Sequence, residues 1–204
     1  MYLNRTAFFL MGTVLLAGCG AEERTEVTPE GVLGESLQVE AEGLAGEREL
    51  TALAYCDDVT TWPAASTDFE NQVLTLVNQR RAAGATCGGV AKPAVPALTL
   101  DTRLRCAARK HSMDMAVNNI FSHTGSNGST PFQRMNLAGY TYKYAGENIA
   151  AGYSTPSAVV TGWMASTGHC NNIMNVNYKH LGVGYYLRSG STYSHYWTQD
   201  FGAQ

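Results

Sequence analysis

The sequence predicts an α+β sandwich, and three observations support this fold class. Segments with apolar residues at helical spacing come first in residues 56–204, and segments rich in Val, Tyr and Trp come last. Helices that precede strands are typical of α+β folds rather than of alternating βα units. Of the 204 residues, 45% are hydrophobic and 15% are charged, which is enough apolar material for one core of ordinary size.

Four helices are predicted, each from a start signal followed by apolar residues at helical spacing. They run over residues 66–84 or 67–84, over about 98–121, from 131 to near 139, and from 155 through 163. Ser66 or Thr67 is the expected cap of the first helix, and Asp101 is a candidate cap of the second. Thr155 is a good cap for the fourth, because Pro156 suits a first helical turn.

Two strands are predicted near the C-terminus, over residues 181–187 and 193–201, joined through a Ser-Gly-Ser turn. Three short stretches between the regular elements contain the residues that could bind a ligand or take part in catalysis. They cover residues 121–125, 146–150 and 162–174, and we expect all three to be loops. His111, in contrast, lies on the apolar face of the second helix and is expected to be a core residue.

Residues 1–18 are predicted to be a signal peptide. A positive charge at Arg5 precedes an apolar run of about ten residues, which is too short to span a bilayer. Residues 16–19, Leu-Ala-Gly-Cys, resemble the bacterial lipoprotein box, which implies that Cys19 is acylated and anchors an exported protein in a membrane. Gly20 rather than Asp follows, which favours the outer membrane or cell surface of the cell envelope. An ordinary signal peptide that ends near a cysteine is the alternative.

Residues 19–55 are predicted to be the acylated cysteine and an acidic, flexible tether. From Gly20 to Tyr55 there are nine Glu and two Arg, whereas residues 56–204 have a net charge of +3. Such a segment has too little apolar surface to offset the entropy of ordering it. A short solvated helix over residues 35–53 is the alternative. Residues 56–204 form the predicted folded domain, expected to be a monomer, and the charge gives no reason to expect nucleic acid as a partner.

Four cysteines remain besides Cys19, and in an exported protein an even number predicts two disulfides. They are Cys56, Cys87, Cys106 and Cys170, which allow three pairings. We favour Cys87–Cys106, which would join the loop after the first helix to the second helix, and this leaves Cys56–Cys170. Free buried thiols are the alternative.

The motifs of the CAP superfamily resemble, in the same order, the stretches at residues 121–125, 146–150 and 162–174. This superfamily includes cysteine-rich secretory proteins, antigen five and the plant pathogenesis-related proteins. The resemblance covers residues 69–202 and is strongest to the compact bacterial branch. It implies an α-β-α sandwich with a small antiparallel sheet between helical layers, and a cleft with two His and two acidic residues. His123, Glu147 and His169 match three of these four, whereas Ser166 stands where the family has its second Glu.

Two neutral imidazoles can occupy two of the four positions around zinc. We therefore expect His123 and His169 to bind zinc or another divalent cation weakly, with Glu147 as a further ligand, as an acceptor that orients an imidazole, or as a base. The alternative is that the three residues form a hydrogen-bonded network that pins three loops, with any ion incidental.

The function predicted is a non-enzymatic binding module of the cell envelope, whose cleft takes a divalent metal or a small ligand. A protease- or esterase-like hydrolase is the alternative, with His123, Glu147 and His169 as catalytic candidates and Ser166 as the hydroxyl to be activated. Ser122 and Ser126 are other candidate hydroxyls. A lipid- or sterol-binding role or a purely structural role is the third hypothesis.

Overall fold

The computed structural model describes residues 29–204, with side chains from residue 43 onward. The predicted signal peptide and Cys19 lie outside the described residues. Ala41–Gln204 forms one compact unit, and the described residues before it, 29–40, belong to a separate unit. In chain order the elements are α1 (Pro29–Cys56), the 3-10 helix η1 (Asp57–Val59), α2 (Ala64–Ala83), β1 (Ala85–Cys87), β2 (Val90–Lys92), β3 (Thr99–Leu100), α3 (Thr102–Asn118), α4 (Pro131–Leu137), β4 (Tyr144–Ala151), α5 (Pro156–Ala165), α6 (Thr167–Ile173), β5 (His180–Leu187) and β6 (His195–Ala203).

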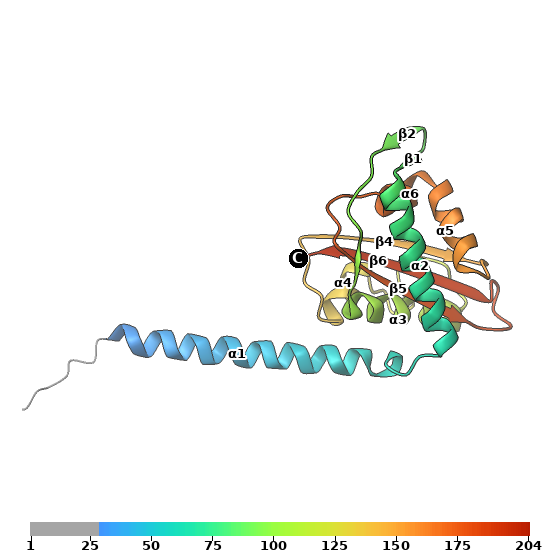
Figure 1. Cartoon of the computed structure of the whole chain (residues 1–204). Helices are drawn as coiled ribbons and strands as arrows, with labels where there is room; N and C mark the ends of the chain where they lie inside the picture. Colours follow the sequence, from blue (N-terminus) through green and yellow to red (C-terminus); the bar gives the residue numbers. More distant parts are fainter. Residues whose placement is uncertain (1–28) are drawn as a thin grey trace, which may run out of the picture. The chain divides into compact units, whose positions relative to one another are not determined.

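The main sheet has four strands in the spatial order β3-β5-β6-β4. Both β4 and β5 pair antiparallel with β6, whereas the short β3 adds to β5 in parallel. Helices α2 and α5 cover one face of this sheet and α3 covers the other (Figure 1). The predicted α-β-α sandwich is confirmed, with β4 as an edge strand of its central sheet.

The larger core lies between the sheet and the helices α2, α5 and α6. Trp163 of α5 and Trp197 of β6 are almost fully buried there, and Trp163 donates a hydrogen bond from Nε1 to the carbonyl of Ile149. Large aromatic side chains bury much apolar area, and their polar edges need such a partner. This core fixes α5 against β4 and so sets where the following helix, α6, begins.

Helix α3 packs unusually close to the opposite face of the sheet. Gly182 and Gly184 of β5 point toward it, and a Cβ atom at either position would come within 2.5 Å of the α3 backbone. Since a side chain at these positions would push the helix away, the two glycines allow the close approach. This proximity lets the Ser112 hydroxyl of α3 donate a hydrogen bond to the Gly184 carbonyl and accept one from the Thr198 hydroxyl of β6.

Two predicted helix caps are confirmed and one is wrong. Asp101 accepts hydrogen bonds from two backbone N–H groups in the first turn of α3, and Thr155 accepts one in the first turn of α5. Helix α2, however, begins at Ala64, before the expected caps Ser66 and Thr67. Pro63 precedes it, and the fixed φ of proline starts the helix without a side-chain acceptor.

Two of the three stretches expected to be loops are regular structure instead. Residues 146–150 lie in β4, and most of residues 162–174 lie in α5 and α6. The expectation failed because residues such as Glu147 and Asn148 are uncommon in strands, so the composition favoured a loop. Both are buried in the structure, where partners from other elements bind their side chains.

Residues 29–56 form the helix α1, so the helical alternative for the acidic segment is the one that the structure contains. Leu44, Leu50 and Leu53 are exposed on it. None of the described helices is both long and apolar enough to cross a membrane.

The two predicted disulfides exist, but the favoured pairing was wrong. Cys56 bonds to Cys106 and Cys87 bonds to Cys170, with Cα–Cα distances of 5.8 and 5.5 Å. Cys56 ends α1 directly before η1, which packs against α3, whereas Cys87 ends β1 beside α6. Adjacency in the fold, which sequence separation does not reveal, decides which thiols meet.

Tryptic digestion without reduction should identify this pairing by mass spectrometry. The expected product joins residues 49–80, which contain Cys56, to the tetrapeptide 106–109, which begins at Cys106. The pairing is expected because the structure places these two cysteines within bonding distance. A product that joins 106–109 to residues 82–103, which contain Cys87, would instead restore the pairing favoured from the sequence.

Candidate functional site

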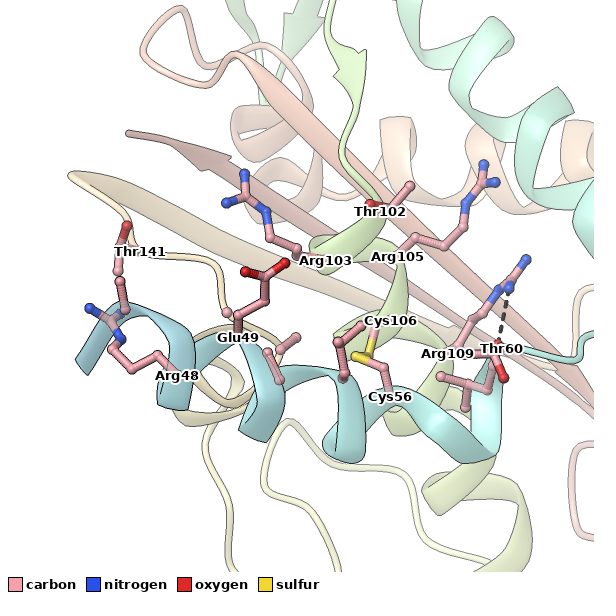
Figure 2. A pocket seen from close by; sticks show the side chains of 16 residues that line it. Arg48, Glu49, Cys56, Thr60, Thr102, Arg103, Arg105, Cys106, Arg109 and Thr141 are labelled. Carbon is pink, nitrogen blue, oxygen red and sulfur yellow. Dashed lines mark hydrogen bonds between the residues drawn. A yellow bond between two sulfur atoms is a disulfide. The ribbon is translucent and has the colours of Figure 1, made fainter. Parts of the chain in front are cut away.

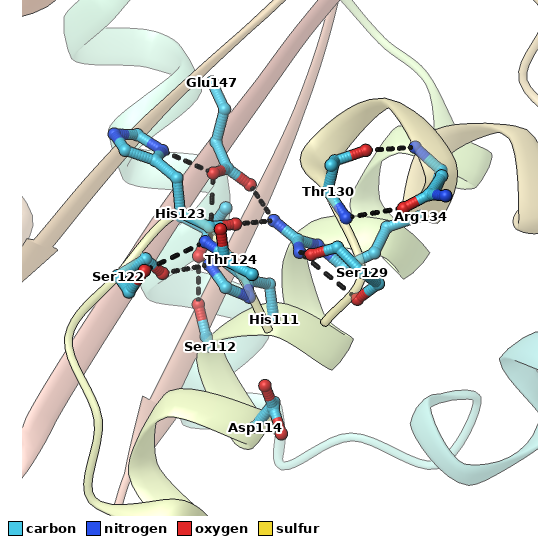
Figure 3. A network of polar contacts seen from close by, with 12 residues as sticks. His111, Ser112, Asp114, Ser122, His123, Thr124, Ser129, Thr130, Arg134 and Glu147 are labelled. Atoms are coloured by element: carbon cyan, nitrogen blue, oxygen red, sulfur yellow. Dashed lines mark hydrogen bonds and ion pairs between the residues drawn. The ribbon is translucent and has the colours of Figure 1, made fainter. Parts of the chain in front are cut away.

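The imidazole of His123 and the carboxylate of Glu147 form the centre of the candidate site. His123 Nδ1 lies 2.6 Å from Glu147 Oε1 (Figure 3). The Glu147 side chain is buried, whereas that of His123 is 52% exposed. An ionised carboxylate can only accept, so Nδ1 carries the proton in this bond. The other ring nitrogen, Nε2, is then the unprotonated one of the neutral imidazole.

Arg134 is the second partner of this carboxylate. Its guanidinium donates a 2.7 Å hydrogen bond to Glu147 Oε2 and a 3.0 Å bond to the carbonyl of His123. A third bond, of 2.8 Å, goes to the carbonyl of Ser129. One buried cation thus holds the strand β4 and two points, at His123 and Ser129, of the loop between α3 and α4 (Figure 3).

The capping interactions at the start of α4 and at the end of α3 fix the positions of Arg134 and His123. Thr130 and Gln133 form a reciprocal capping box at the start of α4, which sets the helix that carries Arg134. At the C-terminal end of α3, Asn119 adopts the left-handed conformation and turns the chain into the loop that contains His123. Asp114 of α3 accepts hydrogen bonds from the backbone and hydroxyl of Ser126, so the loop is tied to the helix before it.

The charge state of Glu147 follows from these contacts. Burial acts to raise the pKa of its carboxyl group, but the hydrogen bond from His123 and the charge of nearby basic groups, Arg134 among them, outweigh burial. The pKa of Glu147 therefore lies below its ordinary value, and the group is an anion at neutral pH. This supports the assignment of the proton to Nδ1 of His123.

His111 of α3 is buried beneath the site, as expected of a core residue. Its Nε2 donates to the carbonyl of Ser122 at 2.9 Å and lies 3.9 Å from Glu147 Oε1. Burial lowers the pKa of His111 to about 4, against the opposing charge of Glu147. His111 is thus neutral at physiological pH and supports the loop that precedes His123.

His169 comes from α6, which packs against β4. Asn148 donates to its backbone carbonyl and to Gln199, and Asn172 in turn donates to the Asn148 side chain. Burial lowers the pKa of His169, and the charge of His123 lowers it further.

The hydroxyl groups proposed as nucleophiles are not aligned with an imidazole. Ser166 lies between α5 and α6, and among the described residues its side chain forms no hydrogen bond with His169 or Glu147. Ser122 accepts from the Thr124 backbone, and Ser126 donates to Asp114. These last two serines thus stabilise loops, as short polar side chains in loops commonly do.

The residues present can provide two metal ligands and an orienting group. Across the described part of the chain, no set of three or more His, Cys, Asp and Glu side chains is close enough to hold a metal. Both oxygens of Glu147 are occupied by His123 and Arg134, so this residue orients an imidazole rather than binding a cation. Nε2 of His123 and the ring of His169 are the nitrogen donors that a two-imidazole site would use.

A cavity of about 800 Å³ lies elsewhere, between the last turns of α1 and the start of α3 (Figure 2). Arg103 and Arg109 are among its lining residues, but carboxylates already pair with both. Asp101 lies 2.6 Å from Arg103, and Glu70 lies 2.7 Å from Arg109. The positive charge of this cavity is largely balanced, and we place no candidate site there.

Sequence reasoning missed Arg134 and the contact of His111 with the site. Nothing in the local sequence distinguishes Arg134 from a solvent-exposed arginine on a short helix. The one available signal was that a buried Glu147 needs a cation nearby. The partner could not be named, because it comes from a separate element.

The chain belongs to the CAP (cysteine-rich secretory protein) family, because the model of this family matches residues 74–201. The uncharacterized protein YkwD of Bacillus subtilis is 40% identical over 142 residues, which are 70% of this chain and 50% of that protein. The uncharacterized membrane protein YlbC of the same organism is 35% identical over 140 residues, which are 69% of this chain and 36% of that protein. The chain thus matches half or less of the length of these relatives.

Solved structures agree with this assignment. An extracellular protein from Bacillus anthracis that contains an SCP domain is 31% identical, with a TM-score of 0.57 over 68% of this chain and 41% of that one. An outer surface protein of Borrelia burgdorferi is 18% identical, with a TM-score of 0.53 over 68% of this chain and 91% of that one. The second similarity extends to the fold alone.

Stability should depend on pH through His111. The unfolded chain takes up a proton at this residue near pH 6.5, whereas the folded chain does so only at about pH 4. The free energy of unfolding should therefore fall as pH drops from 6.5 to 4, by about 3 kcal/mol from this group. Denaturant titrations across this range should show a shallower decline for His111→Gln, whose amide can still donate to Ser122. Equal slopes in both proteins would exclude this role for His111.

Proposed function

We propose that this protein is an exported, lipid-anchored binding module of the cell envelope that takes a divalent cation between two imidazoles. The observation that carries the proposal is the orientation of His123 by Glu147. Because Nδ1 is engaged at 2.6 Å, Nε2 is the free lone pair, and it is the nitrogen directed away from the carboxylate. A metal ligand needs such a fixed and unprotonated nitrogen.

His169 is the second ligand in this proposal. Its lowered pKa keeps the imidazole neutral at pH 7, so a lone pair is available. Two protein ligands leave two positions of a tetrahedral cation to water or to a small ligand. The site is therefore weak and exchangeable, as suits recognition rather than a structural metal. When bound, the cation would polarise whatever ligand shares it.

Calorimetry with Zn²⁺ tests this proposal on the full chain, purified in detergent at neutral pH. Saturable binding of one ion per chain is expected, and both His123→Ala and His169→Ala should abolish it. Glu147→Gln should weaken binding about 10- to 100-fold, because the orienting acceptor loses its charge.

His195→Ala is the matched control and should bind like the unchanged protein, because His195 contacts Tyr185 rather than the site. Binding that survives in both site variants, or no binding at all, would leave the cluster as a network that pins the loop to β4.

The location is proposed on separate grounds. The lipoprotein-like residues 16–19 support a lipid on Cys19, and two of the solved relatives are an extracellular protein and an outer surface protein. Two disulfides are also typical of exported proteins. We expect the two imidazoles to face the envelope or the cell exterior.

Growth of expressing bacteria with a fatty-acid analogue should test the anchor. The full chain should incorporate the label, Cys19→Ser should lose it, and Cys56→Ser should keep it as the matched control. Lipid on Cys19 should also be visible in the mass of the N-terminal peptide. An unlabelled protein whose mature N-terminus lies elsewhere would instead indicate an ordinary signal peptide.

A further inference from the structure

Asp200 of β6 has a carboxyl group that has no role in the proposed function as described so far. It is fully buried, and neither of its oxygens has a hydrogen-bond donor among the described residues. An ionised carboxylate in such a place would lose its hydration without compensation, which is highly unfavourable. The neutral acid avoids this cost, but its hydroxyl then needs an acceptor.

The register of the sheet identifies that acceptor. Asp200 is directly opposite Glu147 in the antiparallel β4–β6 pair and opposite Gly182 in the β5–β6 pair. Side chains directly opposite one another share a face, with Cβ atoms about 4.5–5.5 Å apart. Gly182 contributes no side chain, so Glu147 is the neighbour of Asp200 in this row of the sheet.

The surrounding charges favour one anion in this pair rather than two. Arg134 directs its hydrogen bonds to Glu147, His123 and Ser129, and none of them reaches Asp200. His111, from α3, is neutral at physiological pH. Since Arg134 is the one cation beside this pair among the residues with described side chains, the carboxyl group that holds Arg134 and His123 is the one that ionises.

We propose that Asp200 is a positioning residue of the site: as a neutral acid, it donates its hydroxyl hydrogen bond to the carboxylate of Glu147. Glu147 then has three donors, from His123, Arg134 and Asp200, and they fix the direction in which it holds the imidazole. The pKa directions agree: burial and the charge of Glu147 raise the pKa of Asp200, whereas that of Glu147 is lowered. The inference extends the proposed function, since it concerns how His123 is presented.

Infrared spectroscopy tests the protonation and the partner without any metal. At pH 7 the full chain should show the carbonyl stretch of a protonated carboxylic acid, which Asp200→Asn removes. Asp68→Asn, which changes an exposed aspartate of α2, is the matched control and should keep the band. In Glu147→Gln the band should move to higher frequency or disappear, because the hydroxyl loses its anionic acceptor and the charge that keeps Asp200 protonated beside Arg134 is gone. A chain without this band, or a band unchanged by Asp200→Asn or Glu147→Gln, would overturn the proposal.

Nitrogen NMR of His123 tests the positioning. Asp200→Asn keeps a donor at the same place, so His123 should remain protonated on Nδ1 as in the unchanged chain. Asp200→Val removes the donor at similar volume, so the two tautomers should mix and Zn²⁺ binding should weaken about tenfold. Tautomers that are the same in all three proteins would contradict the role. If the unchanged chain binds no Zn²⁺, the proposed function fails, while the infrared and tautomer results still decide this inference.

Discussion

The carboxylate of Glu147 is the group on which the arrangement of the site depends. It lies on an edge strand, it is buried, and its two oxygens accept from His123 and Arg134. A buried anion is tolerated only when such partners compensate for its lost hydration. Because Arg134 also holds the carbonyls of His123 and Ser129, the same ion pair closes the loop between α3 and α4. Removal of Glu147 would leave a buried guanidinium without its anion and would release His123.

The two imidazoles are supported in different ways, and this difference bears on their function. His123 is fixed by charge, through a short hydrogen bond that selects its tautomer. His169 is fixed through its backbone carbonyl, which accepts from Asn148, and Asn172 in turn holds the Asn148 amide. Its ring forms no hydrogen bond with the described residues. If both imidazoles bind a cation as proposed, one rigid and one adaptable ligand would let the site exchange its ion and admit a second molecule.

The sheet geometry makes this site possible. The glycines of β5 allow α3 to lie close to the sheet, which brings His111 beneath Glu147. Burial there keeps His111 neutral, so it adds no second cation to the ion pair. Each disulfide ties a neighbouring segment to the frame, Cys56 to α3 and Cys87 to α6. The helix that precedes the His123 loop and the helix that carries His169 are thereby both anchored outside the site itself.

From the sequence alone it was possible to predict the fold class, the family and the caps Asp101 and Thr155, and to select His123, Glu147 and His169 as candidate site residues. These depend on local signals or on motifs that occur together in order. The tertiary structure decided that residues 146–150 form a strand, that Cys56 pairs with Cys106, and that Arg134 balances Glu147. Each of these outcomes joins segments that are distant in the chain. Hydrophobic periodicity shows which face of an element is buried, but it does not say which partner lies against that face.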